Sequence, residues 1–277
     1  MQSWAAERAR GGGGAASAVP PRPEPGKCRR CHGEAEPVLL GPVLSKPSRW
    51  VVPDLCGACA EALEASQIQS EEQKRFKRRW EASNLPDSAR DWDWDRAHRW
   101  ARGIKKDPED FKLWQEAFQT CRYWAGNGVL YLYGPEGSGK TTLGFLLCIA
   151  ALDEPGPPPL WLELSALFDL IEGSYAAGSP ARALEARAME AGLLVLDEVG
   201  GPDTDRPRKK QRASLFKIVN HREGRKLPTV ITSNHKPGKL VQVFRDVHDR
   251  TIARLVADGG VEVGGKSFRL IRAERQW

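Results

Sequence analysis

The sequence has no long apolar run. None of its 277 residues lies in a stretch approaching the roughly 20 consecutive apolar residues that a membrane-spanning helix needs. The N-terminal residues are rich in Arg, Gly and Pro and lack the apolar segment of a signal peptide. We therefore expect a cytoplasmic location and no membrane partner.

A large excess of one charge is also lacking. Lys and Arg number 42 against 36 Asp and Glu, a net charge of +6. This modest balance favours polyanionic partners without requiring one. Hydrophobic residues make up 40% and charged residues 28%, as in soluble chains that bury a core. The length allows one domain of ordinary size plus a small one.

Cysteine is scarce and unevenly distributed. Four of the six cysteines form two Cys-x-x-Cys pairs, Cys28/Cys31 and Cys56/Cys59. In a cytosolic chain such pairs indicate metal before disulfide. Four thiolates hold a tetrahedral Zn²⁺ and leave no open position, so we expect a structural zinc site. A redox dithiol is the competing interpretation, and His32 is a conceivable substitute ligand, although an exposed neighbour is the simpler interpretation.

Composition divides the chain into four segments. Residues 1–26 are rich in Gly and Pro and predict a disordered tail. Residues 27–62 hold the cysteine pairs and predict a small zinc-binding domain made of short strands and turns. Residues 63–86 are rich in helix formers and predict a helical linker that ends at Leu85-Pro86. Its basic end, Lys74–Arg79, is either a DNA or partner contact or a solvated helix end. Residues 87–277 then form the main domain.

The most informative stretch begins with an apolar strand, Val129–Tyr133. The loop GPEGSGKT follows and fits G-x-x-x-x-G-K-[ST], and an apolar helix begins after it. Strand, glycine loop and helix in this order predict a phosphate-binding loop. Lys140 is expected to reach the β- and γ-phosphates, and the Thr141 hydroxyl to hold Mg²⁺. The expected ATP-binding residues are Gly134, Pro135, Glu136, Gly137, Ser138, Gly139, Lys140, Thr141 and Thr142.

A second apolar strand, Leu193–Leu196, ends in Asp197-Glu198. Acidic residues often end strands, but after a complete phosphate loop this is the Walker B pattern. Asp197 is then expected to bind Mg²⁺ with Thr141, and Glu198 to act as the general base.

Polar segments follow the later strands. Asp203–Arg212 carries five basic residues and is either a nucleic-acid contact or a solvated loop. Asn234 follows the strand Thr229–Ile231, where a polar side chain lies beside the phosphates or caps the next helix. The remaining expected elements are helices at 107–125, 165–172 with Ser165 as cap, 181–190 and 213–222, and strands at 160–164, 261–263 and 268–271.

Five motifs together resemble the DnaC/DnaI/IstB group of AAA+ ATPases, from Asn84 to Arg272. They are GPEGSGKT, LLVLDEVG, LPTVITSN, DRTIARL and GGKSFR. The resemblance implies an α/β protein with a three-layer α/β/α P-loop AAA+ domain, a parallel sheet and a reduced or absent helical lid. The small four-cysteine zinc domain and the helical linker precede this domain.

The resemblance also implies residue roles. Asn234 resembles the sensor that positions the attacking water. Arg254 resembles the arginine finger that reaches the ATP of a neighbouring copy, although Ala-Arg-Leu stands where the group usually has Ser-Arg-Leu. Arg250 is the second candidate for the finger, and an ordinary surface ion pair is the alternative for both. A finger supplied in trans implies a homo-oligomer.

Within the group, DnaI-type loaders carry a zinc-binding N-terminal domain that docks on the replicative helicase. The cysteine pairs therefore favour a replicative helicase loader that uses ATP, Mg²⁺ and Zn²⁺. Its expected partners are a replicative helicase hexamer and single-stranded DNA. An IstB-like transposition helper ATPase and a nucleotide-switched adaptor with negligible turnover are the alternatives.

Overall fold

A computed structural model describes residues 21–41, 48–244, 256 and 260–269 of the protein. The chain divides into two compact units, Met1–Lys74 and Arg75–Trp277. Helix α1 (Gly57–Ala82) contributes residues to both. Arg250 and Arg254 lie outside the described residues, as does most of the region in which a reduced lid was predicted.

The first unit contains two short antiparallel hairpins and the start of α1. The strands are β1 (Gly26–Lys27) paired with β2 (Glu34–Ala35), and β3 (Val38–Leu40) paired with β4 (Arg49–Val51). Within the described part of this unit, the buried apolar residues are Cys28, Ala35 and Pro37. So little buried apolar surface cannot by itself hold a fold of this size. The second cysteine pair lies at the start of α1, where the unit changes from strands and turns to helix.

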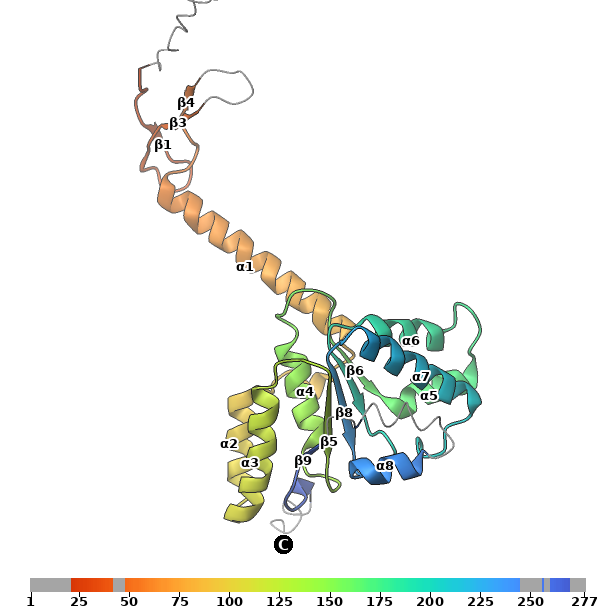
Figure 1. The fold of residues 1–277 in the computed structure, drawn as a ribbon. Helices are drawn as coiled ribbons and strands as arrows, with labels where there is room; N and C mark the ends of the chain where they lie inside the picture. Colours follow the sequence, from red (N-terminus) through yellow and green to blue (C-terminus); the bar gives the residue numbers. More distant parts are fainter. Residues whose placement is uncertain (1–20, 42–47, 245–255, 257–259, 270–277) are drawn as a thin grey trace, which may run out of the picture. The chain divides into compact units, whose positions relative to one another are not determined.

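The second unit is built on a five-stranded parallel sheet with the order β6-β7-β8-β5-β9 (Figure 1). Its strands are β5 (Val129–Tyr133), β6 (Leu160–Glu163), β7 (Leu194–Asp197), β8 (Thr229–Ser233) and β9 (Val261–Glu262). Because all the strands are parallel, their carboxyl ends meet at one edge, where ligands bind in such sheets. At the lateral edge, the Trp161 N–H of β6 donates to the Ser83 carbonyl, 2.8 Å away.

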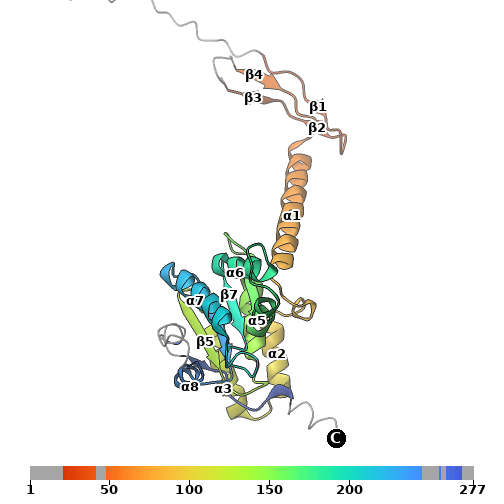
Figure 2. The ribbon, with the colours of Figure 1, turned by 90° about the vertical axis from the view of Figure 1, so that its right-hand side faces the viewer.

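Helices cover both faces of this sheet (Figures 1 and 2). One layer consists of α2 (Trp94–Ile104), α3 (Pro108–Arg122) and α4 (Lys140–Ala150). The other consists of α5 (Leu164–Gly173), α6 (Pro180–Glu190), α7 (Lys209–Gly224) and α8 (Pro237–Val243).

The strands are apolar on both faces, as expected for a sheet covered on both sides. In β5, Leu130 and Leu132 pack into the core with α2, α3 and α4, and Tyr131 packs into the core with α5, α6 and α7. The prediction of a three-layer α/β domain with a parallel sheet is confirmed.

Several local predictions differ from the structure. Helix α2 was not predicted, although Asp93 caps it by accepting a hydrogen bond from the Arg96 N–H. Ser165 is not a helix cap, because α5 begins one residue earlier and the Ser165 hydroxyl donates to the Glu163 carboxylate. Phe268 and Arg269 are helical rather than extended. None of the described helices combines the length and the apolar character required to cross a bilayer.

Candidate nucleotide-binding site and cysteine cluster

The glycine-rich loop connects β5 to the N-terminus of α4. Gly137 and Gly139 have φ angles of 72° and 101°, in the left-handed region that favours glycine. A side chain at Gly137 would collide with Ser267, and a Cβ at Gly139 would lie 3.0 Å from the rings of Phe268 and Trp114. Both positions therefore require glycine, because the backbone conformation disfavours other residues and a side chain would meet its neighbours. The loop ends on a helix N-terminus, where N–H groups attract phosphate.

Lys140 is buried at the start of α4. Its ammonium Nζ donates to the carbonyls of Gly134 and Pro135, at 3.0 and 2.8 Å. Burial lowers the pKa of Lys140, and the negative charges of Asp197 and Glu198 oppose this effect. A buried ammonium at the N-terminus of a helix is suited to an anionic ligand.

Asp197 ends β7 and lies against the start of α4. The Thr141 hydroxyl donates to its Oδ1 over 3.2 Å, and the Thr232 hydroxyl of β8 donates to the same oxygen. Burial raises the pKa of Asp197, and these two hydrogen bonds lower it. The structure thus brings together the two residues predicted to bind Mg²⁺, from positions 56 residues apart in the sequence.

Glu198 follows in a strained backbone conformation. Its φ of 58° is unusual for a residue with a Cβ and costs on the order of 1 kcal/mol. The Glu198 N–H donates to the Thr232 hydroxyl over 3.1 Å, and its carbonyl accepts from the Thr204 hydroxyl over 3.1 Å. Its side chain is exposed, while partial desolvation and the charges of Asp197 and Glu163 raise its pKa.

Asn234 is exposed immediately beyond the carboxyl end of β8. Since Ser233 pairs with Tyr133, which directly precedes the loop, Asn234 lies at the same sheet edge as the phosphate loop. It does not cap α8, because Lys236 occupies that position without a side-chain hydrogen bond.

A pocket of about 200 Å³ lies beside the loop. Three of its lining residues were not predicted as site residues, namely Trp100, Phe268 and Arg269. The Phe268 N–H donates to the Gly137 carbonyl over 2.8 Å, and the Phe268 and Trp100 rings lie 4.3 Å apart between centroids. The motif GGKSFR contains two of these residues, but sequence alone gave neither a role. The other lining residues are Gly137, Gly139, Lys140, Thr141 and Thr142.

The remaining loop residues differ in exposure. Pro135 and Glu136 are exposed, and Glu136 forms an ion pair with Arg269. Ser138 is fully buried, and within the described residues its hydroxyl has no hydrogen-bond partner. The indole N–H of the buried Trp114, which faces Gly139, likewise has no hydrogen-bond partner within the described residues.

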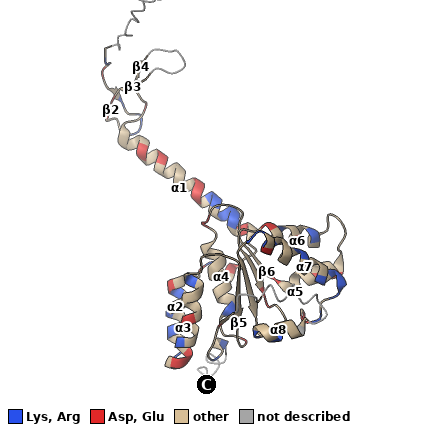
Figure 3. Ribbon diagram, in the orientation of Figure 1, with Lys and Arg blue, Asp and Glu red and all other residues tan. Residues whose placement is uncertain are grey.

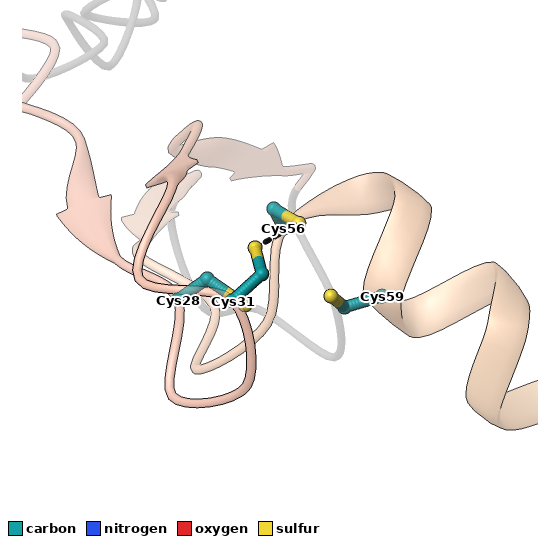
Figure 4. A group of neighbouring side chains, drawn as sticks. All are labelled: Cys28, Cys31, Cys56 and Cys59. Atoms are coloured by element: carbon teal, nitrogen blue, oxygen red, sulfur yellow. Dashed lines mark hydrogen bonds between the residues drawn. The ribbon is translucent and has the colours of Figure 1, made fainter.

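The four paired cysteines form one cluster (Figure 4). All four sulfur atoms lie within 4.8 Å of one another, and Cys31 and Cys56 are 3.6 Å apart. A tetrahedral Zn²⁺ with Zn–S bonds of about 2.3 Å requires sulfurs roughly 3.8 Å apart, so the cluster fits the metal. His32 is not part of this group.

The charges of the cluster also favour a cation. Backbone hydrogen bonds from Cys31 and Cys56 lower the pKa of Cys28 to about 6. Side-chain hydrogen bonds to Cys31 and Cys56, together with the neighbouring thiolate, raise the pKa of Cys59 to about 12. Four thiolates within 4.8 Å of one another would repel strongly, and a bound cation would neutralise that repulsion.

The basic end of α1 is partly occupied by backbone contacts. The guanidinium of the buried Arg79 donates to four carbonyl groups, and Arg75 donates to the carbonyls of Asp153 and Glu154. The carbonyls bound by Arg79 belong to Ala151, Leu152, Gly156 and Pro157. These two arginines hold the C-terminal end of α4 and the loop after it, whereas Lys74 forms an exposed ion pair with Glu71, and Lys77 and Arg78 are exposed.

The basic segment 203–212 is not a single loop. Lys209 and Lys210 form the exposed first turn of α7, where lysines oppose the helix dipole (Figure 3). Arg208 pairs with Glu172.

A phosphate-binding loop and an acidic strand end on a parallel sheet define a P-loop nucleotide-binding protein. Residues 60–276 match the family described as IstB-like ATP binding protein, and the chain belongs to this family. The predicted resemblance to the DnaC/DnaI/IstB group is thereby confirmed. A search of curated proteins found no match.

Solved structures with a similar fold include replication proteins. The crystal structure of DnaI shares 20% identity, with a TM-score of 0.45, 56% of this chain covered and 84% of that chain. The DnaC helicase loader shares 17% identity at a TM-score of 0.44, with 55% and 87% covered. AMPPCP-bound DnaA from Aquifex aeolicus shares 19% identity at a TM-score of 0.45, with 58% and 50% covered.

Proposed function

We propose that the protein hydrolyses ATP at the phosphate loop. The observation that supports this proposal is the hydrogen bond between Thr141 and Asp197, which sets a hydroxyl and a carboxylate beside Lys140. Hard oxygen ligands of this kind are those that Mg²⁺ prefers, and the metal would supply charge neutralisation at the phosphates.

In this proposal each residue has a distinct role. Lys140 and the N–H groups of residues 137–142 bind the phosphates, and Thr141 and Asp197 would hold Mg²⁺. Glu198 accepts the proton of the attacking water, a role favoured by its raised pKa. Asn234 positions that water.

The physiological role that we propose is loading of a replicative helicase during DNA replication. The five motifs shared with the DnaC/DnaI/IstB group and the four-cysteine cluster together support it. The N-terminal cluster, with Zn²⁺ bound, docks on the helicase hexamer, and the ATPase domain binds single-stranded DNA. Arg254, or else Arg250, reaches the ATP of a neighbouring copy, so the active form is a homo-oligomer.

The test uses the purified full-length chain and the replicative helicase of the same host. We expect a complex whose stability changes with ATP, and an ATPase rate that changes with single-stranded DNA. Glu198→Gln should bind ATP normally and lose turnover by 10²-fold or more. Absence of any ATP-dependent complex contradicts the loader role, and equal turnover of Glu198→Gln and wild type contradicts hydrolysis at this site.

The family match favours a second candidate, an IstB-like transposition helper ATPase. This candidate predicts ATP-dependent filaments on long duplex DNA, whereas the loader predicts preference for single strands. A nucleotide-switched adaptor, the third reading, predicts nucleotide-dependent partner binding without measurable turnover.

A further inference from the structure

The turn that carries Glu198 is fastened to the end of β8. The Val199 N–H donates to the Thr232 carbonyl over 2.9 Å, and the Ser233 hydroxyl donates to the Val199 carbonyl over 2.6 Å. The His235 ring approaches the Gly200 carbonyl at 2.9 Å. The acidic turn and the strand that ends beside Asn234 therefore form one hydrogen-bonded assembly.

Thr232 occupies the centre of this assembly. Its hydroxyl donates to the Asp197 carboxylate and accepts from the Glu198 N–H. One hydroxyl group therefore acts as donor to one acidic residue and as acceptor from the next. The residue is 1% exposed. Its methyl group lies on the side of α4, 3.9 Å from the position that a Cβ at Gly144 would take. Packing thus fixes which way the hydroxyl points.

We propose that Thr232 is a positioning residue for hydrolysis. The inference rests on the proposed ATPase activity. By donating to Asp197, the hydroxyl orients a carboxylate that would hold Mg²⁺, and by accepting from Glu198 it maintains the left-handed backbone that aims the general base.

Each half of this role has a physical consequence. Without the hydroxyl, the Asp197 carboxylate loses a fixed donor and can rotate. The Glu198 N–H also loses its acceptor, and the backbone can relax from a φ of 58° toward the ordinary region. Both changes affect turnover more than nucleotide binding, because Lys140 and the loop N–H groups are untouched. Loss of such an outer hydrogen bond to a metal ligand typically costs 10- to 100-fold.

The test compares Thr232→Val, which keeps the shape and removes the hydroxyl, with Thr232→Ser, which keeps the hydroxyl. We expect Thr232→Val to lower kcat by about 10- to 100-fold, with KM for ATP changed less than threefold and a higher Mg²⁺ requirement. Thr232→Ser should remain within threefold of wild type. Ser83→Ala is the matched control, since it removes a buried hydroxyl that donates to the Trp80 carbonyl and accepts from the Leu85 N–H, away from both acidic residues, and it should keep kcat within threefold.

Three outcomes overturn the inference. They are an unchanged kcat in Thr232→Val, a loss in Ser83→Ala as large as in Thr232→Val, and a rise in KM that accounts for the whole effect. If Thr232→Val does not fold, Thr232→Cys replaces it. The kcat of Thr232→Cys should be lower than those of wild type and Thr232→Ser, but still measurable. A wild-type kcat in Thr232→Cys also overturns the inference. If the wild type itself binds ATP but does not turn over, the proposed hydrolysis fails, and the affinity of the nucleotide complex for Mn²⁺ then tests Thr232 separately.

Discussion

Arg269 and Glu136 form an ion pair beside the phosphate loop, with Nη1 and Oε1 2.6 Å apart. Both side chains are about three-quarters exposed, so the pair contributes little to stability. Its position is more informative. Arg269 lines the pocket, while Glu136 belongs to the phosphate loop, so a triphosphate would compete with Glu136 for the guanidinium.

This competition predicts opposite effects of the two partners. Arg269→Ala should weaken MgATP binding about tenfold or more, because a cation beside the phosphates is lost. Glu136→Gln should leave the affinity unchanged or raise it a few-fold. Isothermal titration measures both. Arg225→Ala, which breaks a comparable exposed ion pair with Glu190, serves as control and should bind normally. Normal binding by Arg269→Ala would show that Arg269 is a surface residue only.

Lys140→Met should abolish nucleotide binding without destabilising the free protein. Burial places the folded-state pKa of Lys140 below its ordinary value of 10.5. A lysine whose pKa falls on folding opposes folding at pH values below that folded-state pKa, and the opposition disappears as the pH rises toward 10.5. At pH 7 the substitution should therefore not lower the melting temperature of the free protein.

The MgATP-induced rise in melting temperature should, by contrast, vanish in Lys140→Met. Thermal melts with and without MgATP measure both effects. A variant that MgATP still stabilises as strongly as the wild type would place the nucleotide elsewhere.

Arg79 should be a stability residue and not a DNA contact. Its guanidinium satisfies the carbonyls at the C-terminal end of α4, and Arg79→Met leaves them to solvent. We expect the free energy of unfolding to fall by about 2 kcal/mol. Arg78→Met, at an exposed neighbouring position, should change it by less than about 0.5 kcal/mol. Chemical denaturation measures the difference, and equal stabilities of the two variants would contradict the assignment.

The cysteine cluster should hold one Zn²⁺ per chain. Cys59→Ser should lower the zinc content, while Cys148→Ala, which removes a buried core thiol, should keep it at about one. Removing the metal from the full chain should abolish hydrogen-exchange protection around residues 26–35, because the first unit buries almost no apolar surface. Full protection in zinc-free protein would favour the redox dithiol.

Charge reversal at Lys209 and Lys210 should weaken DNA binding and, at the same time, stabilise the fold. Replacing both by Glu should weaken single-stranded DNA binding uniformly across sequences and reduce the salt dependence, by a slope of roughly 1 to 2. The same change should slightly raise the melting temperature, because acidic residues suit a helix N-terminus. Lys112→Glu, on α3 in the opposite helical layer, is the control. Unchanged DNA affinity would show that this turn is merely solvated.

The sequence predicted the fold where local signals agree with the tertiary structure. The strand Val129–Tyr133 and the apolar strand before Asp197 are buried on both faces, so their continuous apolar runs are sufficient to predict them. Helix α2 was missed although a local signal exists, because Trp94, Ala97, Trp100, Ala101 and Ile104 recur at helical spacing behind the Asp93 cap. Three arginines among its eleven residues interrupt this apolar stripe and make it less evident.

The candidate site was likewise predictable only in part. Motif spacing was sufficient to select the loop, Asp197 and Glu198 as candidates. It could not show that Trp100 and Phe268 meet beside the loop, because that contact joins segments 168 residues apart. Motif spacing also could not show that Arg79 is buried and bound to carbonyls while the neighbouring Arg78 is exposed. That difference depends on the tertiary contacts of α1.

The Ser83 carbonyl, which accepts the amide of Trp161, closes the outer side of β6. An open strand invites another polypeptide to extend the ladder, which is how many sheets aggregate. Because this amide is already paired within the chain, a second copy that extended the sheet at β6 would have to displace the Ser83 carbonyl. Contacts made through side chains on this flank would leave that bond in place.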